Sequence, residues 1–229
     1  MHNTIGILGT GRMGVRLAAM FAELGHGVLL GSRKIERART IAAAIGNGRI
    51  RGSTYGEAAK AEFVLPAIFL RDGLLEQLEP LRAALEGRIL VDITNPFNAT
   101  YDDFILPWDT SGAEQLQHAL PATRVVGAFK NVWWEVFDQP CFDGRPSDVY
   151  VVGDDADAKR SFLSLVEGAP FRFIDAGKLA NARFVERMTL FSAELGQRQG
   201  WFPRMNWRLL GEPWTPGQAD HLKELIGAA

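Results

Sequence analysis

A glycine-rich turn after the first apolar run constrains this chain most strongly. The run Thr4–Leu8 predicts a short buried strand, and Arg12–Leu24 has the periodicity of an amphipathic helix. Between them the sequence reads Gly-Thr-Gly-Arg-Met-Gly, with glycines at the spacing G-x-G-x-x-G. We interpret Gly9 as the tight turn, Gly11 as the place where a phosphate approaches the backbone, and Gly14 as a helix–strand contact. The turn predicts a dinucleotide site at a helix N-terminus; the alternative is the same turn without a ligand.

Short apolar runs alternate with longer amphipathic stretches along the rest of the chain. Runs that are apolar on both faces and separated by helices are typical of a parallel sheet covered on both sides. Because such connections are right-handed, the pattern predicts an α/β fold, a doubly wound, mostly parallel Rossmann sheet with a small C-terminal extension. The predicted strands are Thr4–Leu8, Gly27–Leu30, Arg49–Gly52, Phe63–Phe69, Arg88–Ile93, Arg124–Phe129, Val149–Val152 and Phe171–Ile174. The predicted helices are Arg12–Leu24, Ile35–Ile45, Tyr55–Ala61, Gly73–Leu85, Ser111–Ala119, Asp155–Glu167 and Leu179–Gly200.

The residues after the second predicted strand indicate which dinucleotide the turn binds. Proteins that bind NAD usually carry Asp or Glu at this point, about 20 residues beyond the glycine turn, for the ribose hydroxyls. This chain instead has Ser32, Arg33 and Lys34, with Arg37 one helical turn later. Cations at a helix N-terminus oppose the helix dipole, whereas a hydroxyl and guanidinium groups suit a 2′-phosphate. The sequence therefore predicts NADP(H); the alternative is a solvated basic helix start.

The stretch Trp133–Asp148 is the strongest candidate for a domain boundary. It holds two prolines and a glycine, and the alternation of strands and helices pauses there. We expect an NADP-binding Rossmann domain at 1–132. We expect residues 133–229 to form a C-terminal extension that completes the sheet and either the substrate pocket or a dimer interface. One extended sheet is favoured over two independent domains.

Composition excludes several classes of protein. The chain has 229 residues with 25 basic and 27 acidic side chains, and a net charge of −2 gives no long-range field for nucleic acid or an anionic membrane. One cysteine excludes an intrachain disulfide, and the four histidines have no metal-ligand spacing. No run of about 18 uncharged apolar residues is present, and too few residues precede the first apolar run for a signal peptide. We expect a cytoplasmic protein with a small-molecule substrate and no metal, nucleic-acid or membrane partner.

These motifs, taken with others in the C-terminal half, resemble the F420-dependent NADP oxidoreductase family. The resemblance extends over about Ile5 to Glu186. It is carried by GILGTGRMG at Gly6–Gly14, GSRK at Gly31–Lys34, VDITNP at Val91–Pro96, RVVGAF at Arg124–Phe129, VVGDD at Val151–Asp155 and the stretch Phe173–Arg183. It implies NADP(H) as cofactor, with F420 or a flavin as a possible co-substrate.

The resemblance also implies positions for the cofactor. The pyrophosphate would be held by Gly9, Thr10, Gly11, Arg12 and Met13, and the 2′-phosphate by Ser32, Arg33 and Arg37. The inner ribose would be flanked by Ala67 and Ile68, and the nicotinamide would be bordered by Asn95 and Pro96.

Two features depart from the family's pattern. Gly127–Asn131 stands where many relatives read Lys-Ala-Phe-Asn, and both Val132–Phe137 and Trp201–Trp207 are unusually aromatic. Because these segments lie where we expect a substrate pocket, the resemblance does not settle the hydride acceptor. Trp133 and Trp134 are adjacent and face opposite sides of an extended segment, so we expect one to line the pocket and one to pack in the core.

Chemistry beyond the cofactor depends on the acceptor. Reduction of a carbonyl or imine needs a proton donor, and Lys130, at the end of a predicted strand, is the candidate, with Asn131 orienting the carbonyl. The alternative for Lys130 is a loop lysine exposed to solvent. Asp92 lies at the end of another predicted strand. We interpret it either as a catalytic base or as a carboxylate whose hydrogen bonds are satisfied by nearby loop amides. We read Glu186 as an exposed helix residue paired with Arg183.

The sequence thus predicts an NADPH-dependent oxidoreductase, and three functions remain open. The favoured one transfers a hydride between NADP(H) and a small organic carbonyl or imine compound. The alternatives are hydride exchange with a deazaflavin (F420) or flavin, which requires mainly ring alignment, and a non-catalytic NADPH-binding regulator. Because the extension is short, we expect a homodimer in which a second subunit helps to enclose the site.

Overall fold

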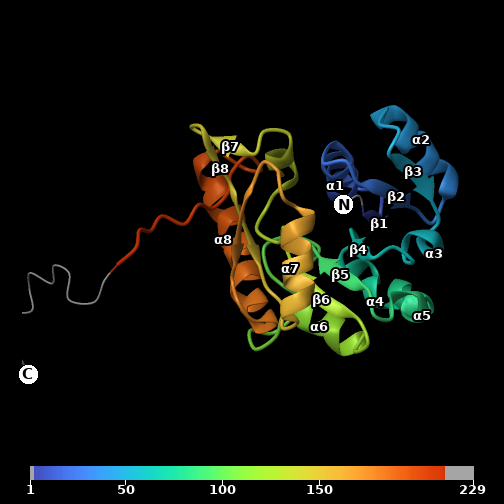
Figure 1. The fold of residues 1–229 in the computed structure, drawn as a ribbon. Coiled ribbons are helices and arrows are strands. Elements are labelled where there is room, and N and C mark those ends of the chain that lie inside the picture. The colour runs from blue at the N-terminus through green and yellow to red at the C-terminus, as the bar shows by residue number, and fades with distance from the viewer. Residues whose placement is uncertain (1–2, 215–229) are drawn as a thin grey trace, which may run out of the picture.

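The computed structural model describes residues 3–214 and is built around a six-stranded parallel sheet (Figure 1). The strand order is β3-β2-β1-β4-β5-β6, in which the chain starts at the centre, winds to one edge and then returns to wind to the other. The strands are β1 (Thr4–Leu8), β2 (Gly27–Gly31), β3 (Ile50–Ser53), β4 (Phe63–Pro66), β5 (Ile89–Asp92) and β6 (Arg124–Gly127). This order confirms the doubly wound Rossmann sheet, and its reversal between β1 and β4 is where such sheets bind ligands.

Helices cover both faces of the sheet, and consecutive strand residues bury their side chains on alternate faces. Leu65 packs in the cluster that contains α1 and α7, whereas its neighbour Val64 packs in the cluster that contains α3 to α6. The α-helices are α1 (Arg12–Glu23), α2 (Ile35–Ile45), α3 (Tyr55–Ala58), α4 (Leu74–Leu78), α5 (Arg82–Leu85), α6 (Gly112–Ala119), α7 (Ala156–Leu165) and α8 (Ala182–Gln199). The described part of the chain also has four short 3-10 helices, which are η1 (Leu70–Asp72), η2 (Glu79–Leu81), η3 (Trp134–Phe137) and η4 (Leu179–Asn181).

The long helix predicted over Gly73–Leu85 is wrong. The structure divides this stretch into α4, η2 and α5. Pro80 lies in η2 and has no amide hydrogen to donate, so a continuous α-helix cannot pass through it without losing a hydrogen bond.

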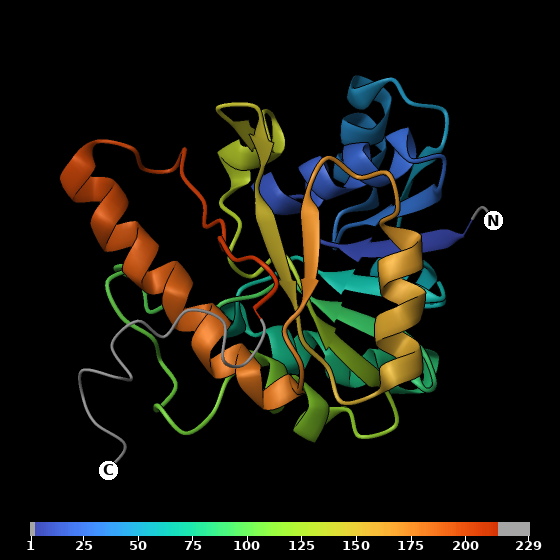
Figure 2. The same cartoon turned by 60° about the vertical axis from the view of Figure 1, so that its left-hand side comes forward.

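Two strands of the extension form a small sheet of their own. β9 (Asp148–Val151) pairs in parallel with β10 (Arg172–Asp175), and Figure 2 shows them side by side, inclined to the six-stranded sheet. β6 ends at Gly127, where two hydrogen bonds of 2.8 and 2.9 Å with Val152 make one antiparallel bridge between the sheets. The expectation of one extended sheet is therefore wrong for residues 3–214. β9 and β10 form a separate sheet, and it meets the six-stranded sheet at one bridge, between Gly127 and Val152, because β6 already ends at Gly127.

The structure contains a β-hairpin with a two-residue turn that was not predicted from the sequence. β7 (Cys141–Phe142) and β8 (Arg145–Pro146) pair in antiparallel fashion around Asp143 and Gly144. Both turn residues have positive φ angles, 48° and 72°, which an Asp-Gly pair tolerates well. That dipeptide was the signal for the hairpin.

After α8 the chain returns along β9 as an irregular segment, residues 200–214, which we call the strap. The amide of Asp148 donates to the Trp207 carbonyl at 3.2 Å, and the amide of Leu209 donates to the Asp148 carboxylate at 2.7 Å. These contacts fix the course of the strap and carry Phe202 back toward β5 and the glycine turn. Among residues 3–214, no helix is long and apolar enough to cross a membrane.

Candidate active site

The three glycines of the turn occupy three different environments. Gly9 has a φ of +132°, and a Cβ there would lie 2.6 Å from the Ala67 carbonyl oxygen. A Cβ on Gly14 would lie 2.2 Å from the Gly9 carbonyl oxygen, so helix and turn are in direct contact. Gly11 precedes the first residue of α1, and a Cβ on it would have no atom within 4 Å. The open space at Gly11 lies at the N-cap of α1, and the unpaired amides of a first helical turn stabilise a phosphate.

A basic edge lies beside the turn, at the end of β2. The Nε of Arg37 donates to the Thr10 hydroxyl at 2.9 Å, which joins the start of α2 to the glycine turn. The Ser32 hydroxyl accepts from the Lys34 amide at 3.1 Å, and the Arg33 side chain is exposed. Glu36, the one acidic residue in the first turn of α2, pairs with Arg39 and not with this edge. Of the residues predicted for a 2′-phosphate, Arg33 and Arg37 are thus exposed and Ser32 is buried.

A cavity of about 660 Å³ opens next to the glycine turn. Its wall combines the turn, the segments after β4 and β5, the segment after β6, the inner face of α8 and the strap. It is lined by Gly11, Arg12, Met13, Ala67, Ile68, Phe69, Ile93, Thr94, Asn95, Phe97, Tyr101, Val132, Trp133, Trp134, Thr189, Gln197 and Phe202. Six of the predicted cofactor residues are among them: Gly11, Arg12, Met13, Ala67, Ile68 and Asn95. Gly9, Thr10, Ser32, Arg33, Arg37 and Pro96 are not.

Aromatic rings form one side of this cavity. The ring centroid of Phe202 lies 4.9 Å from that of Trp133 and 5.7 Å from that of Trp134. The guanidinium of Arg12 lies 4.6 Å above the Trp134 ring, so this wall reaches the start of α1. Both tryptophans line the cavity, and Trp133 is also buried, with its indole nitrogen donating to Ser192 at 3.0 Å. The expected division, one tryptophan in the pocket and one in the core, is therefore wrong.

Lys130 lies outside the cavity wall, in a buried ionic cluster. Its amine contacts Asp92 at 2.5 Å and Glu186 at 2.8 Å, and all three side chains are fully buried. It also donates to the Thr94 carbonyl at 2.5 Å. The alternative of an exposed loop lysine is wrong, and the proton-donor role predicted for Lys130 stays a prediction. Asp92 accepts from the Thr94 amide and hydroxyl at 2.9 and 2.7 Å, so loop groups do satisfy one of its oxygens.

Asn131, the second residue predicted for catalysis, is also fully buried and away from the cavity. Its side-chain amide donates to the Asp148 carbonyl at 2.8 Å, and its oxygen accepts from the Tyr150 amide at 3.3 Å. In this position Asn131 ties the end of β6 to β9. Its predicted role of orienting a carbonyl stays a prediction.

Sequence reasoning missed several residues of the site. Tyr101, Thr189 and Gln197 line the cavity, and Glu186 completes the cluster around Lys130. Phe202, which also lines the cavity, belongs to the aromatic segment that was expected near the pocket. The predicted pair between Glu186 and Arg183 is wrong, because Arg183 binds Glu114 instead, with an Nε–oxygen distance of 2.9 Å. The signal for burial was the helical spacing of Ala182, Val185, Thr189 and Ala193, which places Glu186 on the inner face of α8.

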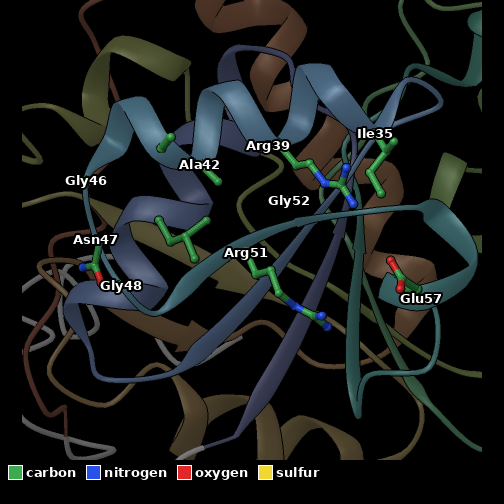
Figure 3. A pocket seen from close by; sticks show the side chains of 11 residues that line it. Ile35, Arg39, Ala42, Gly46, Asn47, Gly48, Arg51, Gly52 and Glu57 are labelled. Carbon is green, nitrogen blue, oxygen red and sulfur yellow. The ribbon is translucent and has the colours of Figure 1, made fainter.

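A second hollow, of about 480 Å³, lies between α2 and β3 (Figure 3). Two of its three charged lining side chains already serve local structure: Arg39 pairs with Glu36 at 2.7 Å, and Glu57 accepts from the Thr54 amide at 3.0 Å in the capping box of α3. None of the predicted cofactor residues lines this hollow. It adds no group to the candidate active site. Within residues 3–214, no group of three His, Cys, Asp or Glu side chains is placed to hold a metal ion.

Comparison with known proteins agrees with this geometry. A family model described as NADP oxidoreductase, coenzyme F420-dependent, matches residues 4–96. The F420-dependent NADP reductase of Methanocaldococcus jannaschii is 31% identical over 199 residues, which cover 79% of this chain and 86% of that protein. A crystal structure from Arthrobacter sp. FB24 superimposes with a TM-score of 0.76 at 26% identity, over 86% of this chain and 94% of that one. An imine reductase from Bacillus cereus shares the fold at 19% identity, with a TM-score of 0.60 over 86% of this chain and 63% of the other.

The fold and the turn define a Rossmann protein of the dinucleotide-binding class. The 31% identity to the Methanocaldococcus jannaschii reductase, over most of both chains, identifies the family within this class. The chain belongs to the F420-dependent NADP oxidoreductase family, as its motifs predicted, and is an NADP-dependent oxidoreductase.

Proposed function

We propose that the protein transfers a hydride between NADP(H) and a deazaflavin of the F420 type. This was the alternative that the sequence left open, and one observation moves it ahead of a small carbonyl or imine acceptor. The cavity beside the glycine turn is walled by aromatic rings, while the Lys130 amine lies outside it among three acceptors. Transfer between two flat rings requires alignment and exclusion of water more than a protein acid.

The residues of the site fit an NADP-type dinucleotide. The space in front of Gly11 admits the pyrophosphate to the amides of α1, and Arg33 and Arg37 supply charge for the 2′-phosphate. Bound there, the nicotinamide supplies or accepts the hydride, and the cofactor carries the redox chemistry. Trp133, Trp134 and Phe202 then act as a platform that holds the acceptor ring and keeps water from the reacting faces.

A second candidate remains, because one phenol lines the cavity. Reduction of a small imine or carbonyl needs a proton at the nitrogen or oxygen as the hydride reaches carbon. The Tyr101 side chain is about two-fifths exposed and lies on the cavity wall. In this alternative Tyr101, and not Lys130, is the proton donor.

We also propose a homodimer. α8 and the loop before α6 expose large apolar side chains, with Phe184 69%, Phe191 55% and Trp108 78% exposed. Exposed aromatic groups of this kind are enriched at protein interfaces. A second subunit on this side of α8 would cover the outer face of a helix whose inner face lines the cavity.

An acceptor screen under NADPH tests the function, with F420, free flavins and cyclic imines offered to the wild type and to Tyr101→Phe. The proposal expects turnover with F420 that survives Tyr101→Phe. Turnover with imines alone, abolished by Tyr101→Phe, would support the second candidate and overturn the first. Tight NADPH binding without turnover on any acceptor would instead indicate a regulator.

The aromatic wall has its own test. Trp134→Leu is expected to raise the KM for F420 about tenfold or more, since loss of one ring–ring stack is worth about 1–3 kcal/mol. The matched control is Trp201→Leu, because Trp201 is exposed and does not line the cavity. Equal KM values in the two variants would contradict the platform.

A further inference from the structure

Both the side-chain amine and the main-chain carbonyl of Lys130 contact the same two parts of the fold, the loop after β5 and helix α8. On the side of the loop after β5, its amine donates to the Thr94 carbonyl at 2.5 Å and its own carbonyl accepts from the Asn95 side-chain amide at 2.7 Å. On the side of α8, its amine contacts Glu186 at 2.8 Å and its carbonyl accepts from the Thr189 hydroxyl at 2.7 Å. Lys130 therefore clamps two consecutive loop residues against one turn of α8.

Two carboxylates surround the buried Lys130 amine and favour its charged form, although burial raises the pKa of one of them, Glu186. Burial by itself lowers the pKa of Lys130, but the nearby Asp92 and Glu186 carboxylates more than offset this, so its pKa is raised. Glu186 also accepts from the Gly112 amide at 3.0 Å, at the N-terminus of α6. A buried ion cluster with this many partners has one arrangement, because moving any member leaves a buried charge unpaired.

The clamp decides how the Asn95 amide is turned. Its nitrogen must face the Lys130 carbonyl, since the reverse orientation would place two oxygens against each other. The Asn95 Oδ1 atom is then buried, and within residues 3–214 it has no hydrogen-bond partner. Asn95 also lines the cavity, so the unpartnered oxygen belongs to a residue that a ligand in the cavity would contact. A buried acceptor left unpaired is costly, and an N–H donor on the ligand removes that cost.

We propose that Lys130 is a positioning residue that fixes the Asn95 amide so that its Oδ1 accepts a hydrogen bond from the carboxamide N–H of the nicotinamide. The inference rests on the proposed function only in placing the nicotinamide in this cavity. The carboxamide is the one N–H donor on that ring. Holding it fixes the rotation of the ring, and so determines which face of the nicotinamide meets the acceptor.

The test compares the binding of NADPH with that of its 3-acetylpyridine analogue, whose acetyl group has no N–H. Dissociation constants are measured by titration without an acceptor. The wild type is expected to bind NADPH about tenfold more tightly than the analogue. In Asn95→Ala the ratio of the two constants is expected to fall to about one. Lys130→Met keeps the main-chain carbonyl but releases the amine contacts with the loop and α8, so there the ratio is expected to fall part of the way. Binding of 2′,5′-ADP, which lacks the nicotinamide, is expected to stay unchanged in both variants.

The matched control is Lys159→Met, which removes a lysine from an ion pair with Asp175 outside the cavity and should keep the wild-type ratio. If Lys130→Met fails to fold, Glu186→Gln tests the role of Lys130 in its place. This change weakens the contact of the amine with α8 while Asp92 still holds the amine. The ratio of the dissociation constants of the analogue and NADPH is expected to fall in this variant too.

The outcomes separate the inference from the proposed function. An unchanged ratio in Asn95→Ala, with tight NADPH binding, overturns the assignment of Oδ1 and leaves the proposed function standing. An unchanged ratio in folded Lys130→Met or Glu186→Gln overturns the positioning role of Lys130. Failure of the wild type to bind either NADPH or 2′,5′-ADP overturns both the inference and the proposed function.

Discussion

The glycine turn allows cofactor binding to be separated from folding, because Gly11 and Gly14 differ in what surrounds them. A methyl group on Gly11 meets no atom within 4 Å, and its φ of −84° suits any residue. Gly11→Ala is therefore expected to change the free energy of unfolding by less than about 1 kcal/mol, the usual effect at a helix N-cap. The same methyl group on Gly14 would lie 2.2 Å from a backbone oxygen, so Gly14→Ala is expected to cost about 1–3 kcal/mol.

NADPH binding, unlike stability, should be strongly weakened by Gly11→Ala. The methyl group occupies the space through which the pyrophosphate reaches the first-turn amides of α1. Hydrogen bonds to a charged group are worth about 1.5–3 kcal/mol each, so loss of one or two weakens NADPH binding by about 3 kcal/mol, or more than a hundredfold in Kd.

Two measurements check this pair of variants: urea unfolding for stability and calorimetric titration with NADPH for binding. Wild-type affinity in Gly11→Ala would refute the placement of the pyrophosphate at the turn. Unfolding of Gly11→Ala at the same urea concentration as Gly14→Ala would refute the reading of Gly11 as open space. Either result would show that the contacts of the turn have been wrongly assigned.

Three other changes have defined outcomes. Arg33→Glu replaces a cation with an anion beside the predicted 2′-phosphate, so NADPH affinity should fall at least tenfold and NADH affinity little; titration at fixed ionic strength checks this, and equal losses would contradict it. The pKa of Asp148 is lowered, because its ion pair with Arg172 and the Leu209 amide outweigh the opposing effect of burial. A lowered folded-state pKa stabilises the protein above the ordinary aspartate pKa of about 4, and this stability is lost as the pH falls below it. Arg172→Met should therefore reduce stability to urea at pH 7 and far less near pH 3. The double change Phe184→Ser and Phe191→Ser should give a monomer in sedimentation experiments; an unchanged mass would contradict the proposed interface.

Two controls match these variants. Arg160→Glu makes the same change of charge on α7, where the side chain is 71% exposed, and should leave the affinities for NADPH and NADH unchanged. Arg198→Met removes an arginine from an exposed pair with Glu194 and should show little difference between pH 7 and pH 3. Effects of similar size in the controls would mean that net charge, and not the named contacts, is responsible.

Much of the fold could be predicted from the sequence because its signals are local. The strands from Thr4–Leu8 onward show as apolar runs, and α2 begins and ends where its periodicity predicts, at Ile35–Ile45. The glycine turn and the basic edge are also local, since a few consecutive residues carry the turn geometry and the charge. The prediction of one helix over Gly73–Leu85 was wrong because Pro80 interrupts it, and a proline is likewise a local signal.

The amino-acid sequence by itself determined the sheet, the phosphate turn and the charge beside it. Only the tertiary structure brought together Lys130 and Glu186, 56 residues apart, and carried Phe202 on the strap to the two tryptophans after β6. Such contacts have no period that a sequence reveals, because they depend on where α8 and the strap pack against the sheet. For the same reason, whether a lysine is a solvated side chain or a buried clamp is decided by the groups that surround its amine.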